Sequence, residues 1–237
     1  MAEDRPGNAY TQLLSLAVHE FRTPASVVGG YLRMLQRDVD QPLSGRQRKM
    51  VDEADKACGR MVALVSELSD ISKIDTGSAV FKDERFDLFQ LISEVAKEMH
   101  EAVEREVHLQ PSGEASGASI TGDPGRMGAA FSAFFRAILR EQPYAVTIVA
   151  ERRIVSDNGS PAAVVLIARE HDVQQSYKSG RSAFDELRGG LGLALPLARR
   201  VVERHGGRVW APDLGAETSQ GRQAIAVSIP ITVEPGR

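Results

Sequence analysis

The stretch that decides the fold of this chain is LLSLAVHEFRTPASVVGGYLRML, residues 13–35. Its apolar residues recur at steps of three and four, which is the period of an α-helix with one buried stripe. The stripe consists of Leu13, Leu16, Ala17, Phe21, Val27, Val28, Tyr31, Leu32 and Leu35. The pattern predicts a single amphipathic helix with an N-cap at Asn8 and an end near Asp38.

Within this helix lies the run His-Glu-Phe-Arg-Thr-Pro, from His19 to Pro24. Glu20 stands beside the imidazole, where a carboxylate can accept a ring proton and raise the nucleophilicity of the other nitrogen. Thr23 is four residues further on and shares a helix face with His19, although hydroxyls at such positions also commonly bond back to helix carbonyls. Pro24 has no amide to bond the Glu20 carbonyl, so we expect a bend there.

A second helix follows a break at Gln41-Pro42-Leu43-Ser44-Gly45, with Ser44 as its cap and an end near Lys73. Its apolar stripe consists of Met50, Val51, Ala54, Cys58, Met61, Val62, Val65, Leu68 and Ile71. Two long helices joined by a short loop predict an antiparallel hairpin. Each helix has a wide apolar stripe and one partner. A second copy that completes a four-helix bundle is the simplest cover, and packing on the rest of the chain is the alternative.

After Arg85 the pattern changes to short strands and shorter helices. The expected elements are a strand and a helix over 86–99, strands near 107–109 and 118–121, a helix over 125–140, a strand hairpin over 145–153 and 162–169, a polar loop over 170–187, a helix over 195–206, and strands over 208–211 and 223–231. These elements predict a mixed sheet with helices on one face, an α/β sandwich. The expected organisation is α+β, with a helical hairpin over 1–78 and the sandwich over 79–237.

The amino-acid composition argues against several classes of protein. The 237 residues are 42% apolar and 26% charged, as in ordinary globular domains. The formal net charge of −3 argues against nonspecific nucleic-acid binding. A single cysteine, Cys58, excludes an intramolecular disulfide framework and a cysteine-rich metal site, and no metal site is predicted. No apolar run has the length of a membrane span and the N-terminus has no signal-peptide core, so a cytoplasmic location is predicted.

The HEFRTP run resembles the H-box of the sensor histidine kinases of two-component signalling, in which the histidine is phosphorylated on a ring nitrogen. The resemblance implies that His19 is the phosphoacceptor and Glu20 the general base for phosphorylation. It also implies that Thr23 positions water when the family acts in reverse, as a phosphatase on its response regulator.

The same resemblance implies a homodimer and a response-regulator receiver domain as the partner. Receiver docking in this family uses the lower part of the hairpin. Val28, Tyr31 and Leu32 are therefore candidates for contact with the receiver, and the alternative is that they complete the core of the dimer.

Residues 85–232 resemble the catalytic ATP-binding domain of histidine kinases, within the wider family of DNA gyrase and heat-shock-chaperone ATPases. The resemblance depends on FDL near the start, GDPGRM before the central helix, and GGLGLAL followed by RRVVERHGGRVW near the end. A glycine loop that opens a helix offers free amides to phosphates. Gly190 and Gly192 match the glycines of the family, and the alternative for either one is a simple turn before a helix.

Two other motifs depart from the family pattern. Arg136 stands where an asparagine would hold Mg²⁺, and arginine has no acceptor atom for a cation. The preceding asparagine of the family falls on Ser132. Glu170 stands in place of the aspartate that reads the adenine amino group. The two glycines that follow in the family are replaced by Asp172 and Gln174, so the backbone cannot pass a base in the same way.

Three hypotheses follow for function. The first is a histidine phosphotransferase that exchanges phosphoryl groups between His19 and receiver aspartates without ATP. The second is an ATP-dependent histidine autokinase, in which Arg136 would neutralise phosphate in place of Mg²⁺. The third is a non-catalytic pseudokinase scaffold. The complete HEFRTP run argues against the scaffold and the altered pocket argues against the kinase, so the sequence favours the phosphotransferase, while leaving open whether ATP and Mg²⁺ bind.

Overall fold

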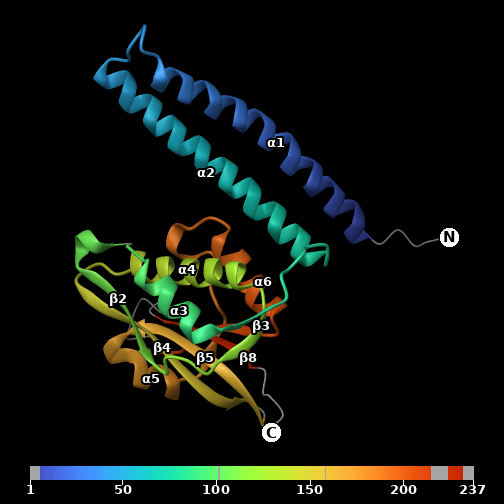
Figure 1. The fold of residues 1–237 in the computed structure, drawn as a ribbon, viewed down its shortest axis with the longest axis vertical. Coiled ribbons are helices and arrows are strands. Elements are labelled where there is room, and N and C mark those ends of the chain that lie inside the picture. The colour runs from blue at the N-terminus through green and yellow to red at the C-terminus, as the bar shows by residue number, and fades with distance from the viewer. Residues whose placement is uncertain (1–5, 101, 158, 215–223, 232–237) are drawn as a thin grey trace, which may run out of the picture. The chain divides into compact units, whose positions relative to one another are not determined.

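The computed structural model of the chain describes residues 6–100, 102–157, 159–214 and 224–231. Two compact units make up the chain, Met1–Ala79 and Val80–Arg237. The first is a helical hairpin and the second is a mixed α/β sandwich (Figure 1). This architecture confirms the fold class expected from the sequence.

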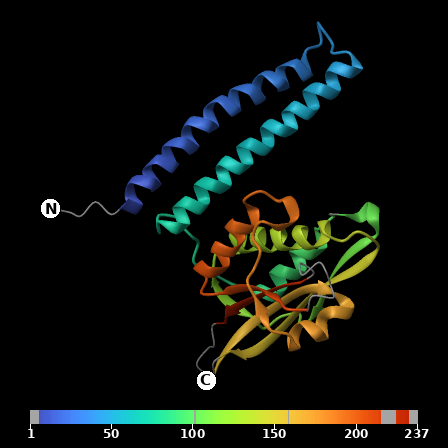
Figure 2. The ribbon, with the colours of Figure 1, turned by 180° about the vertical axis from the view of Figure 1, so that it is seen from behind.

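The hairpin consists of α1, Pro6–Arg37, and α2, Gly45–Asp75. Ser44 caps α2 as predicted, with a reciprocal pair: the Gln47 amide donates to the Ser44 hydroxyl and the Ser44 amide donates to the Gln47 side chain. The N-cap prediction for Asn8 is wrong, because α1 already begins at Pro6, a residue that suits the first helical position. α1 continues through Pro24 as one helix, with a gentle curve that is visible in Figure 2.

The two helices approach closely at the middle of the hairpin. The Cys58 thiol is buried and donates a hydrogen bond to the Ala25 carbonyl at 2.9 Å. A Cβ atom at Gly29 would lie 3.3 Å from the sulfur, so the small residue permits this spacing. Cys58 therefore has the packing role that its place on the stripe indicated.

A large part of both apolar stripes stays exposed within one hairpin. The exposed large side chains are Leu16, Phe21, Val27, Val28, Tyr31, Met34, Leu35, Met50 and Met61. Exposed apolar side chains gathered on one element are typical of an interaction surface. The hairpin by itself therefore does not bury its own apolar surface.

The second unit is built on a six-stranded sheet with the order β2-β4-β5-β8-β7-β6. The strands are β2 Val107–Gly113, β4 Val146–Asp157, β5 Ser160–Arg169, β8 Ile225–Pro230, β7 Arg208–Pro212 and β6 Arg181–Ser182. β2 runs parallel to β4 and every other pair is antiparallel. A separate pair joins β1, Glu84–Asp87, to β3, Ser119–Gly122. The sheet is mixed, as predicted.

Three helices cover one face of the sheet: α3 Leu88–Lys97, α4 Pro124–Arg140 and α6 Ala194–Arg204. The core between them contains fully buried aromatic side chains, including Phe89, Phe131 and Phe135. α4 lies centrally and contacts both α3 and α6. The first helical turns of α3 and α4 are capped by the side chains of Asp87 and Asp123.

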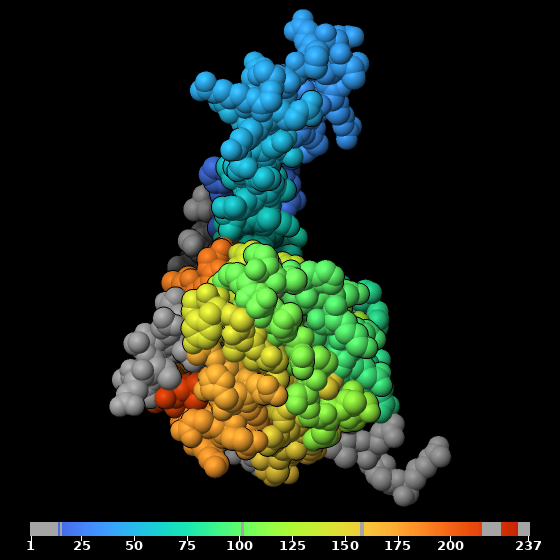
Figure 3. Space-filling model, turned by 90° about the vertical axis from the view of Figure 1, so that its left-hand side faces the viewer, coloured from blue at the N-terminus to red at the C-terminus, as the bar shows by residue number. Residues whose placement is uncertain are grey.

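The expectation of helices on one face only is wrong. The segment predicted as a polar loop over 170–187 contains the 3₁₀ turn Glu170–Asp172, the helix α5 Val173–Lys178 and strand β6. α5 packs on the opposite face of the sheet (Figure 1), and atoms of this part of the chain, in orange, lie at the surface in Figure 3. It covers a second cluster, formed by Val149, Leu166, Ala168, Val173, Ala224 and Ala226. Because the central strands are apolar on both faces, each face needs a cover.

Asp123 joins three segments of the second unit at the start of α4. Its carboxylate accepts hydrogen bonds from the amides of Arg126 at 2.9 Å and Lys82 at 3.2 Å. Its own amide donates to Nε2 of His205 at 3.0 Å. Burial alone would raise the pKa of this carboxyl, but the two amide donors and the charge of Arg126 outweigh burial and hold the pKa below its ordinary value.

We expect Asp123→Ala to lower the free energy of unfolding of the second unit by about 1–2 kcal/mol at neutral pH. Because the carboxyl pKa is depressed on folding, its contribution is present above the unfolded pKa of about 3.9 and is lost as pH falls through the folded value. Urea unfolding followed by the fluorescence of Trp210, the sole tryptophan, measures the difference at each pH. Exposed Asp83→Ala is the control. A difference that is independent of pH would contradict this role.

Candidate functional site

His19 lies on α1 with its side chain 81% exposed. The nearest charged group is the Glu20 carboxylate, whose Oε1 lies 4.0 Å from Nδ1 of the imidazole. A carboxylate on the Nδ1 side favours the tautomer with a proton on Nδ1, which leaves the lone pair on Nε2. The exposed imidazole can therefore meet a reacting group from solvent or from a partner with Nε2 as the nucleophile.

The Thr23 hydroxyl donates a hydrogen bond to the His19 carbonyl at 3.4 Å. This is the back-bonded arrangement that threonine often takes inside helices. Thr23 thus lies one turn after His19 on the same face, as the spacing predicted, and its hydroxyl is directed at the backbone.

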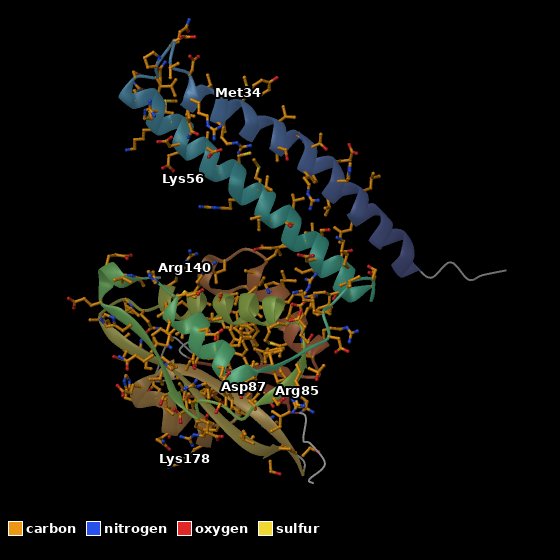
Figure 4. The ribbon with its side chains drawn as sticks, viewed as in Figure 1. Met34, Lys56, Arg85, Asp87, Arg140 and Lys178 are labelled. Atoms are coloured by element: carbon orange, nitrogen blue, oxygen red, sulfur yellow. The ribbon has the colours of Figure 1, made fainter. Side chains whose placement is uncertain are left out.

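Three exposed apolar side chains share the face of α1 that carries His19: Leu16, Val27 and Met34, the last labelled in Figure 4. At 100° per residue they lie within roughly 80° of His19 around the helix. Val28 and Leu32 lie roughly 140–180° away by the same geometry. Leu32 is half-buried in the hairpin. The surface around His19 is therefore formed by a different set of residues from the one that the sequence indicated.

The glycine loop of the second unit precedes α6 and packs on α4. Gly189, Gly190 and Gly192 all have positive φ angles, of 73°, 60° and 63°. A Cβ atom at Gly189 would lie 3.1 Å from the Cα atom of Ala137 in α4. Only glycine combines this backbone conformation with this approach.

The segment before the glycines is tied to the same face of α4. Arg188 is 2% exposed, and its guanidinium binds the Glu141 carboxylate through two contacts, one of them Nε to Oε1 at 3.2 Å. The Phe184 ring packs edge-on against Phe134, with 5.7 Å between centroids. Protein side chains therefore cover the α4 face that the glycine loop borders.

Arg136 lies on another face of α4. It is exposed and, with Ser132, lines a groove of about 390 Å³ against the C-terminal end of α3, formed by Val95, Glu98, Met99 and His100. The contact of Gly189 is with the neighbouring residue, Ala137, roughly 100° further around the helix. The groove that Arg136 lines does not include Gly190 or Gly192.

Glu170 is exposed at the end of β5, in the 3₁₀ turn that leads to α5. The chain that follows it crosses to the opposite face of the sheet, where Val173 is buried under α5. In the part of the chain that the structure describes, no three His, Cys, Asp or Glu side chains are grouped to hold a metal ion. Among the same residues, no helix is long and apolar enough to cross a membrane.

Comparisons with known proteins agree with the fold, and a family model covers the hairpin. Residues 9–77 match the model of the His Kinase A (phospho-acceptor) domain. The sensor protein GacS of Pseudomonas syringae pv. syringae is 22% identical over 231 residues, which cover 89% of this chain and 24% of GacS. Histidine kinase 3 of Arabidopsis thaliana is 32% identical over 123 residues, 50% of this chain and 11% of that protein.

Among solved structures, full-length ShkA in complex with AMPPNP has a similar fold, with a TM-score of 0.68 and 20% identity. The similarity covers 95% of this chain and 47% of ShkA. The present chain thus corresponds to about half of ShkA and to about a quarter or less of GacS and Histidine kinase 3.

Residues 9–77 thus correspond to a phospho-acceptor domain of the His Kinase A type, and the chain is similar in sequence to sensor histidine kinases over most of its length. The α/β unit that follows has the fold of the corresponding part of ShkA. His19 and its neighbours lie within the residues matched by the phospho-acceptor model.

Two features were not predicted from the sequence: the packing of Arg188 and Phe184 on α4, and the helix α5. The contact between Arg188 and Glu141 joins residues 47 positions apart, which no local pattern reveals. For α5, a signal was present: Val173 and Tyr177 are four residues apart in a segment that otherwise appears polar, a spacing that places both side chains on one helix face.

Removing the buried Arg188 is expected to lower stability more than removing the half-buried Arg199 of α6. Arg188→Ala leaves Glu141 without its buried partner, so the free energy of unfolding should fall by about 3 kcal/mol. Arg199, whose side chain is 33% exposed, pairs with Glu186 and Glu203, and Arg199→Ala should cost about 1 kcal/mol or less. Urea unfolding followed by Trp210 fluorescence measures both, and equal losses would contradict an anchoring role for Arg188.

Proposed function

We propose that this protein is a histidine phosphotransferase of two-component signalling, in which His19 exchanges a phosphoryl group with a receiver-domain aspartate and ATP use is impaired or absent. The observation that carries the proposal is the exposed His19 within an intact HEFRTP run on a phospho-acceptor hairpin. An imidazole that is exposed to solvent and has a neighbouring carboxylate is suited to accept and release phosphoryl groups.

In the forward step, the Nε2 lone pair of His19 attacks the phosphorus of the receiver's aspartyl phosphate. The N–P bond forms as the bond to the aspartate oxygen breaks, and the receiver's carboxylate leaves. Glu20 faces Nδ1 and stabilises the positive charge that develops on the ring. The receiver's own Mg²⁺ neutralises the phosphoryl oxygens, so this chain needs no metal for the step. The reverse step regenerates the free imidazole.

A homodimer is part of the proposal. Phe21, Val28 and Leu35 are exposed in the single hairpin and lie on the side of α1 away from His19. A second hairpin packed on this side would bury them in a four-helix bundle and leave both His19 side chains accessible. Thr23 keeps its proposed role of positioning water for receiver dephosphorylation, which requires its hydroxyl to leave the His19 carbonyl.

Receiver docking is assigned to the His19 face of α1. Leu16, Val27 and Met34 provide exposed apolar contacts there, and small residues, Ser26 and Gly30, lie nearly in line with His19. A partner helix can approach closely over small residues and pack against the larger apolar ones. Tyr31 lies between this face and the dimer side, about 120° from His19, and either contact suits it.

Three features support impaired ATP use. Arg136 replaces an oxygen ligand for Mg²⁺ and lies away from the glycine loop. The loop is anchored on α4 by the buried Arg188 and by Phe184, where a nucleotide would need space. The residues after Glu170, where the family pattern has two glycines beside the base, form a turn and then α5 on the opposite face of the sheet.

The alternative is an ATP-dependent histidine autokinase. It is favoured by the fold, which is similar to that of ShkA, a protein whose solved structure contains AMPPNP. In this alternative Glu170 would read the adenine, and the amides near Gly190 and Gly192 would hold phosphates. A pseudokinase scaffold is the third candidate, and the intact HEFRTP run disfavours it.

The test compares phosphoryl transfer to the protein from two donors, ATP and phosphorylated receiver domains. Purified protein and its His19→Gln variant are incubated with γ-labelled ATP and Mg²⁺, or with a panel of receiver domains phosphorylated by labelled acetyl phosphate. We expect acid-labile label on the wild type from a receiver, no label from ATP, and no label on His19→Gln. Label from ATP would establish the autokinase instead. Label from neither source would leave the scaffold.

A matched pair of substitutions tests the different roles proposed for the two faces of α1. Val27→Asp should lower the rate of phosphotransfer from a receiver at least tenfold and leave the dimer intact. Val28→Asp should shift the protein to the monomer, because a buried charge without a partner opposes bundle packing. Light scattering gives the oligomeric state and labelled receiver gives the rate. A dimer defect in Val27→Asp, with normal assembly in Val28→Asp, would reverse the assignment of the faces.

A further inference from the structure

A cavity of about 150 Å³ lies between α5 and the sheet, on the face opposite α3, α4 and α6. Its floor is one cross-strand row in which Ala226 of β8 lies between Leu166 of β5 and Trp210 of β7. The small Ala226 between two large neighbours leaves the hollow. Tyr177 of α5 closes the cavity from above, and Arg181 borders it.

The Tyr177 hydroxyl is a buried donor without a hydrogen-bond partner among the described residues. Burial raises the pKa of Tyr177 to about 12, so the hydroxyl stays protonated at neutral pH. A buried polar group without a partner costs free energy, and most such groups in folded proteins have one. The hydroxyl therefore points to an acceptor atom that a ligand would supply.

Two arginines contact the aromatic side chains that line the cavity. The Arg153 guanidinium lies 4.3 Å from the centre of the Tyr177 ring and is paired with the Glu151 carboxylate, so this pair is close to neutral. The Arg181 guanidinium lies 4.4 Å from the centre of the Trp210 ring, and no ion pair joins it to a carboxylate among the described residues. Arg181 is exposed, which places its positive charge where the cavity reaches the surface.

The volume and the lining residues of the cavity indicate which class of ligand it can hold. A cavity of this volume holds a benzene-sized ring and excludes a nucleotide. The aliphatic and aromatic walls formed by Val164, Leu166 and Trp210 suit a flat apolar ring. A carboxylate on the ring would accept from the Tyr177 hydroxyl and approach Arg181.

We propose that the cavity between α5 and the sheet is a binding site for a small aromatic carboxylate, with its ring on Trp210 and its carboxylate held by Tyr177 and Arg181. The site lies on the opposite face of the sheet from the glycine loop and shares no residue with it. It is independent of the phosphotransfer proposal, because none of its groups lies in the hairpin.

Benzoate is the probe, and Trp210 is the reporter because it is the sole tryptophan of the chain. We expect saturable quenching or shift of its fluorescence, with a Kd on the order of a millimolar for a ligand of this size. Isothermal titration gives Kd independently of the fluorophore. Benzyl alcohol and benzylammonium test the charge requirement, and each should bind at least tenfold more weakly.

Tyr177→Phe keeps the ring and removes the hydroxyl, so Kd for benzoate should rise about tenfold, the loss of one hydrogen bond to a charged group. Arg181→Gln should raise Kd several-fold. Lys178→Gln is the matched control, since Lys178, labelled in Figure 4, is an exposed cation on α5 outside the cavity lining. The control should bind as the wild type does.

The proposal is overturned if benzoate gives no saturable response by either method. It is also overturned if Tyr177→Phe and Arg181→Gln bind benzoate as tightly as Lys178→Gln, or if benzylammonium binds as tightly as benzoate. Amide hydrogen exchange gives a further check on location: benzoate should slow exchange in α5 and leave α3 unchanged.

Discussion

The helical period of α1 is the constraint on which the phospho-acceptor unit depends. Residues that contact α2, such as Val18 and Ala25, are fixed on one side by close packing around Cys58. The same period then places His19 on an outer face with its side chain in solvent. One helix thereby carries three surfaces: a core side, a second apolar side that the hairpin leaves open, and an exposed side with His19.

In the second unit, a sheet that is apolar on both faces determines the organisation. The strands β4, β5 and β8 need a cover on each side, and α5 supplies the second one. The segment that forms α5 is the one in which the family pattern would place the two glycines beside the nucleotide. Asp172 and Gln174 at those positions belong to the turn and the helix that build this cover. The same segment therefore carries both the residues that differ from the expected motif and the helix that covers the second face.

Most elements could be predicted from the sequence because their signals are local. The cap at Ser44 and the runs of valine and isoleucine in β4 and β5 depend on residues a few positions apart. The start of α1 was misplaced because Pro6 and Asn8 offer competing local signals. The segment 170–187 was taken for a loop because its helix is a single short stretch whose stability comes from the sheet beneath it.

The sequence by itself determined the hairpin, the place of His19 on the first helix and the likeness of residues 9–77 to a phospho-acceptor domain, because periodicity and a contiguous motif need no long-range information. The tertiary structure decided which residues surround His19, where Arg136 lies relative to the glycine loop, and that Arg188 and Glu141 cover one face of α4. These features arise from packing between segments far apart in the chain. Which face of a helix can bind a partner depends on which of its other faces are buried against neighbouring elements.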